Sequence, residues 1–252
     1  MKRVFFFLPI AVVSLLVFQR TATSEPPPAP AVVLRDPGPA QLDDAPKYDA
    51  SRDGIMGYYV GSFGPNKITI RIEKAVGDSV LGFSVVAGNE RAFSGRLERR
   101  GPYFFVTVNE PGDAPHDGRF EFLAAPKDGT LTGTWVAYDK GIASIQFSLK
   151  RRDFKYAATS GKYPQASTRL LKTRDVENIQ PDRLRVMRNE IYARHGYSFK
   201  MKDMRNYFDA QDWYMPMATN VSTRLTATEQ QNETLIKRYE QYGAEYYDSF
   251  GR

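Results

Sequence analysis

Between residues 57 and 152 the apolar side chains repeat with a period of two, and this limits the fold more than any other feature. In 68–72 and again in 104–108, alternate apolar residues share one side of an extended chain. Turn signals rich in Gly, Asp and Pro separate such runs, for example at 76–78 and 126–129. The pattern predicts seven to eight short strands in an antiparallel meander, either a small barrel or a curled sheet.

Glycines recur one or two residues before an apolar residue along this region. Glycine weakens the interior of a strand, so its repeated use predicts places where the sheet bends toward closure. In pattern alone the region resembles small lipocalin-like or avidin-like meanders, and no particular family is indicated. The glycines concerned are Gly61, Gly82, Gly95, Gly118 and Gly133.

The N-terminus has the features of an export signal. Two cations precede the apolar run 4–18, which is shorter than the roughly 20 residues that span a bilayer. Small residues at Ala22 and Ser24 fit a cleavage site before Glu25. We therefore expect a signal peptide over 1–24, with a retained N-terminal anchor as the alternative. Both predict that the rest of the chain is exported.

Cysteine usage and charge narrow the compartment and the partners. The chain has no cysteine, so it has no acceptor for an N-terminal lipid and no disulfides, which favours a bacterial envelope over an animal secretory route. Lys2, Arg3 and Arg20 account for three units of the net charge of +6, which leaves +3 after cleavage. The remaining charge is spread evenly without a basic stripe, so no nucleic-acid partner is predicted.

Composition divides the exported part into two domains of an α+β protein. Residues 25–52 are proline-rich and read as an extended tether. The β domain is expected over 53–153, and the polar, turn-rich segment 154–168 reads as a linker. From there to the end, 169–252, the signals are those of a small helical domain.

Three helices are predicted in this second domain. The first begins at Pro181, a favoured residue at the first helical position, and ends at Gly196. A short second helix is expected within 200–210, with Met204, Tyr207 and Phe208 inward. Thr226 and Glu229 have the spacing of a capping box and open the last helix. That helix is expected to bury Leu235, Ile236, Tyr239, Tyr242 and Tyr246.

His195, one of only two histidines, lies at the end of the first helix. At 100° per residue it continues the apolar stripe of that helix. Gly196 can adopt the left-handed conformation that follows a helix, which makes His195 the C-cap. Tyr197 would then pack back on Tyr192, as in a Schellman ending. The stretch predicts a partly buried capping histidine rather than a catalytic one.

Residues for other chemistry are missing from the sequence. The only other histidine, His116, falls in a turn of the β domain, so no metal site is predicted. No cysteine nucleophile, Gly-x-Ser-x-Gly elbow or glycine-rich phosphate loop occurs. Glu190 and Arg194 form an i,i+4 pair outside the apolar stripe of their helix. We therefore expect a chain without enzymatic activity, cofactor or metal.

The runs "RLRVMRNEIYARHGYSF", "YFDAQDWYMP" and "LTATEQQNETLIKRYE" resemble the YARHG domain, a family of bacterial extracellular modules, from about Arg169 to Glu240. The resemblance implies an exported, envelope-facing protein. It transfers no catalytic residue, since the family has none assigned. The motif residues are candidates for binding, with a structural role favoured: Arg188, Glu190, Tyr192, Arg194, His195, Gly196, Tyr197, Trp213 and Tyr214.

These features predict an exported bacterial envelope protein with a non-enzymatic binding or scaffold role. Its partner would be cell-wall polymer or an envelope protein, and it would touch the membrane only through an uncleaved N-terminus. An alternative is a lipocalin-like binder of a small apolar ligand, provided that the barrel centre is not filled by Ile70, Phe104, Trp135 and Phe147. A hydrolase of unknown class is a remote alternative. Aromatics that could stack on sugars are Tyr58, Tyr59, Trp213, Tyr214, Tyr246 and Tyr247.

Overall fold

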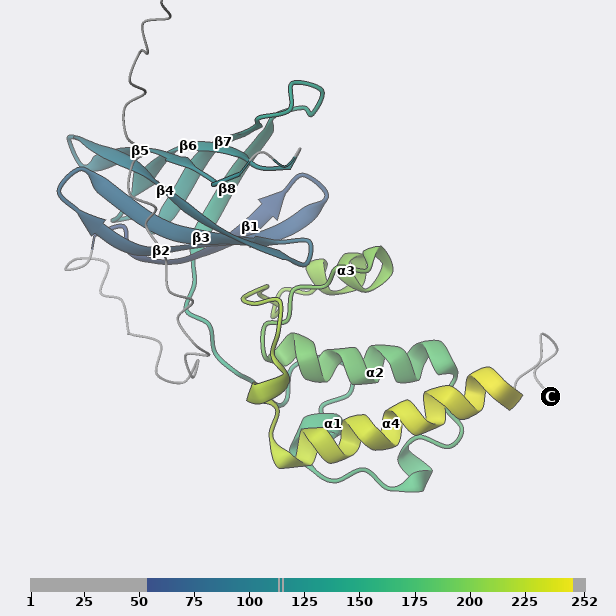
Figure 1. Cartoon of the computed structure of the whole chain (residues 1–252). Helices are drawn as coiled ribbons and strands as arrows, with labels where there is room; N and C mark the ends of the chain where they lie inside the picture. The colour runs from purple at the N-terminus through teal and green to yellow at the C-terminus, as the bar shows by residue number, and fades with distance from the viewer. Residues whose placement is uncertain (1–53, 113, 115, 247–252) are drawn as a thin grey trace, which may run out of the picture. The chain divides into compact units, whose positions relative to one another are not determined.

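The computed structural model describes residues 54–112, 114 and 116–246. The predicted signal peptide and tether lie outside these residues, as do Tyr247 and the side chain of Tyr246. The described residues belong to one compact unit, in which a β-barrel precedes a helical region (Figure 1). Within this part of the chain, every helix is too short or too polar to be a membrane span.

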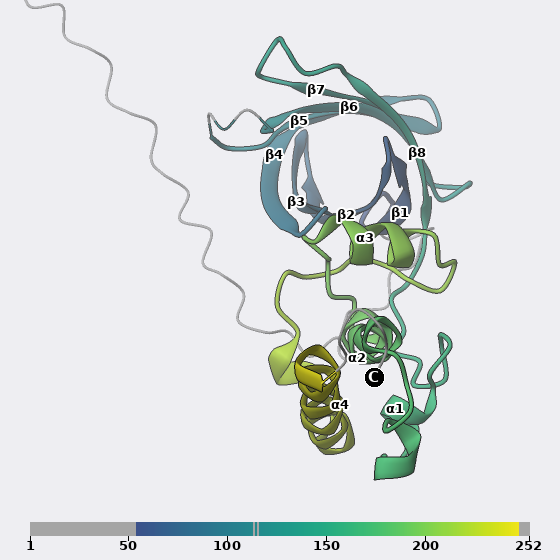
Figure 2. The same cartoon turned by 90° about the vertical axis from the view of Figure 1, so that its right-hand side faces the viewer.

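Eight antiparallel strands follow one another around a closed barrel (Figure 2). Closure comes from pairing of the first strand with the last, with Gly61 opposite Leu149. The predicted meander is therefore confirmed, and of its two forms the chain adopts the barrel. The strands are β1 (Gly57–Phe63), β2 (Asn66–Val76), β3 (Ser79–Val86), β4 (Asn89–Arg100), β5 (Tyr103–Asn109), β6 (Gly118–Ala125), β7 (Thr130–Ala137) and β8 (Ile145–Arg151).

The barrel centre is filled by the side chains that the period-two pattern places inside. Ile70 in β2 is fully buried, together with both apolar neighbours two residues away. Aromatic rings occupy the rest, with Phe120 and Phe147 at a centroid distance of 5.8 Å. Trp135 and Phe147 belong to this core, and the half-buried Phe104 packs against it. A ligand enclosed at the centre of the barrel has no room beside these side chains.

At all five predicted glycines the adjacent strand lies too close for a side chain. A Cβ atom at Gly133 would lie 2.6 Å from the Cα of Phe122, and one at Gly95 would lie 2.7 Å from the Cα of Val108. Real Cβ atoms do not approach other atoms this closely. Glycine is therefore required where tightly coiled strands cross, as the sequence indicates.

The outer wall of the barrel is partly covered by the helical region. Tyr58, on the outside of β1, packs against Met215 and Met217. Tyr59 points inward, and its hydroxyl donates to the carbonyl of Ile55 at 2.9 Å. The expectation that these two tyrosines offer stacking surfaces for sugars is therefore wrong, because both are at least 95% buried by neighbours on either side of the strand.

Helices α2 and α4 form the core of the helical region, where Leu184 and Ile191 pack with Ile236. As predicted, proline stands at the first position of α2. Tyr242, by contrast, is 47% exposed, because the described elements leave this end of α4 uncovered. The elements are α1 (Gln165–Thr168), η2 (Thr173–Asp175), α2 (Pro181–Arg194), α3 (Lys202–Asp209), η3 (Ser222–Arg224) and α4 (Ala227–Tyr246).

Two features of this region bear on the predicted elements and domain boundaries. Met204 and Phe208 point inward from α3, as expected, and Tyr207 is half-buried. The segment 154–168, which the sequence marks as a linker, contains α1 and the fully buried Ala166. The boundaries themselves stay a prediction.

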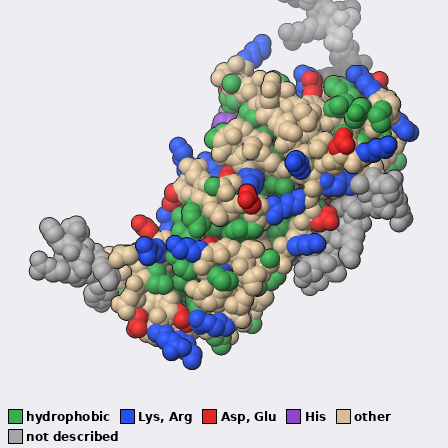
Figure 3. All heavy atoms as spheres, turned by 180° about the vertical axis from the view of Figure 1, so that it is seen from behind, with side chains coloured by type: hydrophobic (Ala, Val, Ile, Leu, Met, Phe, Trp, Pro, Cys, Tyr) green, Lys and Arg blue, Asp and Glu red, His purple; other side chains and the backbone are tan. Residues whose placement is uncertain are grey.

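On the face shown in Figure 3, Lys and Arg side chains are scattered among acidic ones.

Substituting Gly133 by alanine is expected to destabilise the barrel by about 1–3 kcal/mol, because the new methyl group forces strands β6 and β7 apart. Urea unfolding followed by tryptophan fluorescence measures the change. The neighbouring Thr132 is exposed, so Thr132→Ala should alter the free energy of unfolding by less than about 0.5 kcal/mol. Equal losses in the two variants would contradict the close approach of the strands.

Candidate functional site

Helix α2 ends in the geometry that the sequence predicts. His195 is the C-cap and Gly196 has a φ of +79°. The amide of Gly196 donates to the carbonyl of Ala193 at 3.0 Å, and that of Tyr197 to Tyr192 at 3.1 Å. These are the two hydrogen bonds of a Schellman motif. The rings of Tyr192 and Tyr197 pack against each other at a centroid distance of 6.1 Å.

The His195 ring is held between two residues from outside its helix. Its Nε2 lies 2.7 Å from Oε2 of Glu229, at the start of α4. One face of the ring stacks on Tyr156 at a centroid distance of 4.6 Å. His195 is 6% exposed and Glu229 is fully buried, so the pair lies in the interior rather than in an open cleft. This arrangement supports the capping interpretation.

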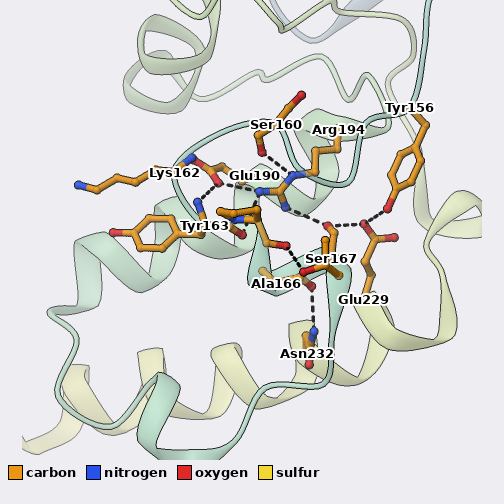
Figure 4. Close-up of polar contacts among 12 residues, drawn as sticks. Tyr156, Ser160, Lys162, Tyr163, Ala166, Ser167, Glu190, Arg194, Glu229 and Asn232 are labelled. Atoms are coloured by element: carbon orange, nitrogen blue, oxygen red, sulfur yellow. Dashed lines mark hydrogen bonds and ion pairs between the residues drawn. The ribbon is translucent and has the colours of Figure 1, made fainter.

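Glu229 forms hydrogen bonds with four other residues. Its carboxylate accepts hydrogen bonds from Tyr156 at 3.0 Å and Ser167 at 2.6 Å (Figure 4). It also contacts His195. It also forms the predicted capping box, accepting from the amide of Thr226 at 2.9 Å and donating its own amide to the Thr226 hydroxyl. Burial alone would raise its pKa, but these hydrogen bonds outweigh it and lower the pKa to about 2.

Glu190 and Arg194 form a buried ion pair, with Nη2 and Oε2 2.8 Å apart and almost no exposure on either side chain. The sequence placed this pair outside the apolar stripe, and that face is covered by the segment around residue 163 (Figure 4). The amides of Lys162 and Tyr163 each donate to the Glu190 carboxylate at 2.8 Å. Arg194 donates to the carbonyl of Ser160 at 2.8 Å. These hydrogen bonds compensate for the hydration that the Glu190 carboxylate and the Arg194 guanidinium lose on burial.

Two further motif residues join α2 to α4. The Arg188 guanidinium pairs with the Glu240 carboxylate at 2.9 Å. The hydroxyl of Tyr192 donates to Glu233. Burial, followed by the hydrogen bond to that carboxylate, raises the pKa of Tyr192 to about 12.

The last two candidates lie at the junction with α3. Tyr214 is 1% exposed, and its hydroxyl donates to the carbonyl of Tyr197 at 2.7 Å. Trp213 is half-buried, with its ring in edge contact with Phe208. All nine motif residues are thus buried or half-buried. They contribute to two regions of packing, between α2 and α4 and at the junction with α3, and none of them is an exposed surface residue.

Residues 161–241 match the family model of the YARHG domain. This chain carries a YARHG domain. The match begins before Arg169, where the resemblance in the sequence starts, and it includes Tyr163 and Ser167. The buried charges of the motif and most of their partners thus lie within the match, whereas Tyr156 and Ser160 precede it. Searches of curated proteins and of solved structures gave no match for the chain.

A cavity of about 520 Å³ opens at the end of the barrel where β1, β3, β5 and β7 terminate. Its apolar surface includes Phe63, Phe120 and Trp135, which separate it from the filled barrel centre. The sequence did not indicate this site. The remaining lining residues are Asn66, Val86, Ala87, Asn89, Arg91, Glu110, His116, Ile142, Ile145, Lys200 and Arg205.

Glu110 is the buried polar group of this cavity, with 4% exposure. It accepts hydrogen bonds from the Ser84 hydroxyl at 2.7 Å, the Gly118 amide at 3.0 Å and the Trp135 indole at 3.1 Å. Burial raises the pKa of this carboxyl, although the hydrogen bonds oppose the shift. These contacts fix the Trp135 ring in the cavity floor.

His116 and an ion pair lie near Glu110. The Arg91 guanidinium, which lines the cavity, pairs with Asp117. His116 is exposed at the rim, in the turn where the sequence places it. Within the described ranges, no three His, Cys, Asp or Glu residues gather in a group able to hold a metal ion. The mouth thus combines an aromatic floor with a few fixed polar groups, as small-molecule sites do.

Replacing Glu229 by glutamine is expected to lower the free energy of unfolding at pH 7. Its depressed pKa means that the ionised form stabilises the fold fully above the unfolded value of about 4.5. The contribution is lost as pH falls toward 2. Urea unfolding of wild type and variant across this range should show a difference that shrinks below pH 4.5.

An exposed glutamate on the same module provides the control for this measurement. Glu177→Gln should change the free energy of unfolding by less than about 0.5 kcal/mol at every pH. A Glu229→Gln difference that stays constant between pH 7 and pH 3 would contradict the role of the carboxylate charge.

Proposed function

We propose that this chain is a non-enzymatic binding protein of the bacterial envelope, and that it holds a small, largely apolar ligand in the mouth of its barrel. The cavity bounded by Phe63, Phe120 and Trp135 carries this proposal. Its volume of about 520 Å³ falls within the range of roughly 300–1,000 Å³ typical of small-molecule sites. The site lies above the filled core, so the ligand would sit in the mouth and not in the centre.

The YARHG domain supports an envelope role in a general way, because the resemblance implies exported, envelope-facing proteins. The N-terminal sequence supports export independently, since Val4–Phe18 and the small residues before Glu25 fit a signal peptide. The surroundings of the motif residues indicate that a ligand binds elsewhere on the chain. Glu190, Arg194 and the Nε2 atom of His195 are engaged in internal hydrogen bonds and buried, so they are poorly placed to bind a cell-wall polymer.

The absence of enzymatic activity remains part of this proposal. His195, the residue that a catalytic hypothesis would use, is 6% exposed and lies against Glu229 and Tyr156. A general base must reach the proton that it removes, which this position does not allow without opening of the domain. A hydrolase would therefore need a different base.

A neutral fluorescent probe tests ligand binding directly. N-phenyl-1-naphthylamine should gain fluorescence with the full-length protein, because the cavity offers it an apolar site. Ile142 lines the mouth, so the larger ring of Ile142→Trp should narrow the cavity and weaken the gain. Val136→Trp places the same ring on the outer face of β7, where Val136 is 39% exposed, and should leave binding intact.

The outcomes of this comparison are distinct. Equal probe binding in Ile142→Trp and wild type would place the dye elsewhere and overturn the proposal. Thermal unfolding of both variants shows whether either substitution disturbs the fold. Native mass spectrometry of protein isolated from its own host is the companion measurement, and an adduct that is less abundant in Ile142→Trp is the expected result.

A further inference from the structure

The rim of the barrel mouth is completed by residues of the YARHG domain. Lys200 and Arg205, which precede and belong to α3, line the cavity together with strand residues of the barrel. The amide of Gly88, in the turn between β3 and β4, donates to the hydroxyl of Ser198 at 3.0 Å. This contact fixes the segment that carries Lys200 beside the mouth.

A second connection places α3. The amide of Lys67, in β2, donates to the Asp209 carboxylate at 2.9 Å, and its ammonium donates to the carbonyl of Gln211 at 2.6 Å. In the view along the barrel, α3 lies beside the part of the barrel wall that β1 and β2 form (Figure 2). Arg205 is therefore held at the mouth by contacts at both ends of the helix segment.

The charges of these two cations are only partly balanced within the described part of the chain, by the more distant carboxylate of Asp209 near Arg205. Neither Lys200 nor Arg205 forms an ion pair there. The Arg205 guanidinium donates once, from Nη1 to the carbonyl of Lys200 at 3.0 Å. Its Nε is buried without a hydrogen-bond partner among the described residues, which is an unfavourable position for a charged donor.

The other charged groups of the lining are already engaged. Arg91 pairs with Asp117, and both oxygens of Glu110 accept hydrogen bonds from the protein. Asp209 acts on Arg205 electrostatically, but its Oδ2 accepts the Lys67 amide. Lys200 and Arg205 are thus the cations of the lining without an ion-pair partner among the described residues, and they share the cavity with an aromatic floor.

We propose that the ligand of the barrel mouth is a small amphiphile, whose apolar part packs on the aromatic floor and whose anionic end binds Lys200 and Arg205. This inference rests on the proposed function and names its ligand class. An arginine donor fork and an ammonium suit a carboxylate or a phosphate ester. A cationic ligand is disfavoured, because the one carboxyl in the lining is saturated by Ser84, Gly118 and Trp135.

The proposal assigns the YARHG domain a part in specificity. The barrel supplies the apolar surface, and the YARHG domain supplies the charge that recognises one end of the ligand. The site is therefore incomplete in either domain alone.

Displacement of N-phenyl-1-naphthylamine by dodecanoate and by dodecanol tests the ligand class, since the two compounds share a chain and differ in charge. Wild-type protein should bind dodecanoate more tightly than dodecanol. The double substitution Lys200→Gln, Arg205→Gln should lower that affinity ratio by roughly tenfold or more at low salt. Arg205→Lys keeps the charge and should retain most of the preference.

Lys202 provides the matched control, because it is an exposed cation on α3 that does not line the cavity. Lys202→Gln should leave the ratio unchanged. A wild-type ratio near one, or an equal fall in the Lys202 variant, would overturn the anionic ligand and leave the binding site standing. Failure of both compounds to displace the probe would count against the proposed function itself.

Discussion

The buried carboxylate of Glu229 joins parts of the YARHG domain that are distant in the sequence, together with Tyr156 from the segment before it. It caps α4 through Thr226, meets the end of α2 at His195, and accepts from Tyr156 and Ser167 in the covering segment. A charge in the interior is tolerated only when donors replace the lost water. The same reasoning applies to Glu190 and Arg194, so the family motif specifies a set of mutually dependent buried charges.

Local patterns predicted the parts of this structure that are locally determined. The alternation of apolar and polar residues predicted the strands. The close approach of the adjacent strand at Gly133 explains why glycine recurs among them. The Schellman ending at Gly196 and the capping box at Glu229 each involve residues that are close together in the sequence, so both can be recognised from the sequence alone. Closure of the barrel was left open, because pairing of Gly61 with Leu149 joins opposite ends of the domain.

Burial by distant segments explains what the sequence did not reveal. Glu190 and Arg194 lie outside the apolar stripe, and the segment that covers them has no periodicity of its own. Tyr58 is covered by methionines more than a hundred residues further along the chain. The cavity was missed for the same reason, since its lining comes from several strand ends and from the residues around α3. The buried Glu110, directly after a strand, was the one local signal that could have directed attention there.

Closure through β1 and β8 also governs when the barrel can form. The first and last strands are the only neighbours in the described barrel that are not consecutive in the sequence, so their pairing requires the whole of residues 57–151. Until that moment the growing sheet has two unpaired edges, at which another chain could add. Afterwards the sheet has no edge at all. Pairing of β8 with β1 therefore removes the sites through which the strands of an incomplete barrel could add to another chain.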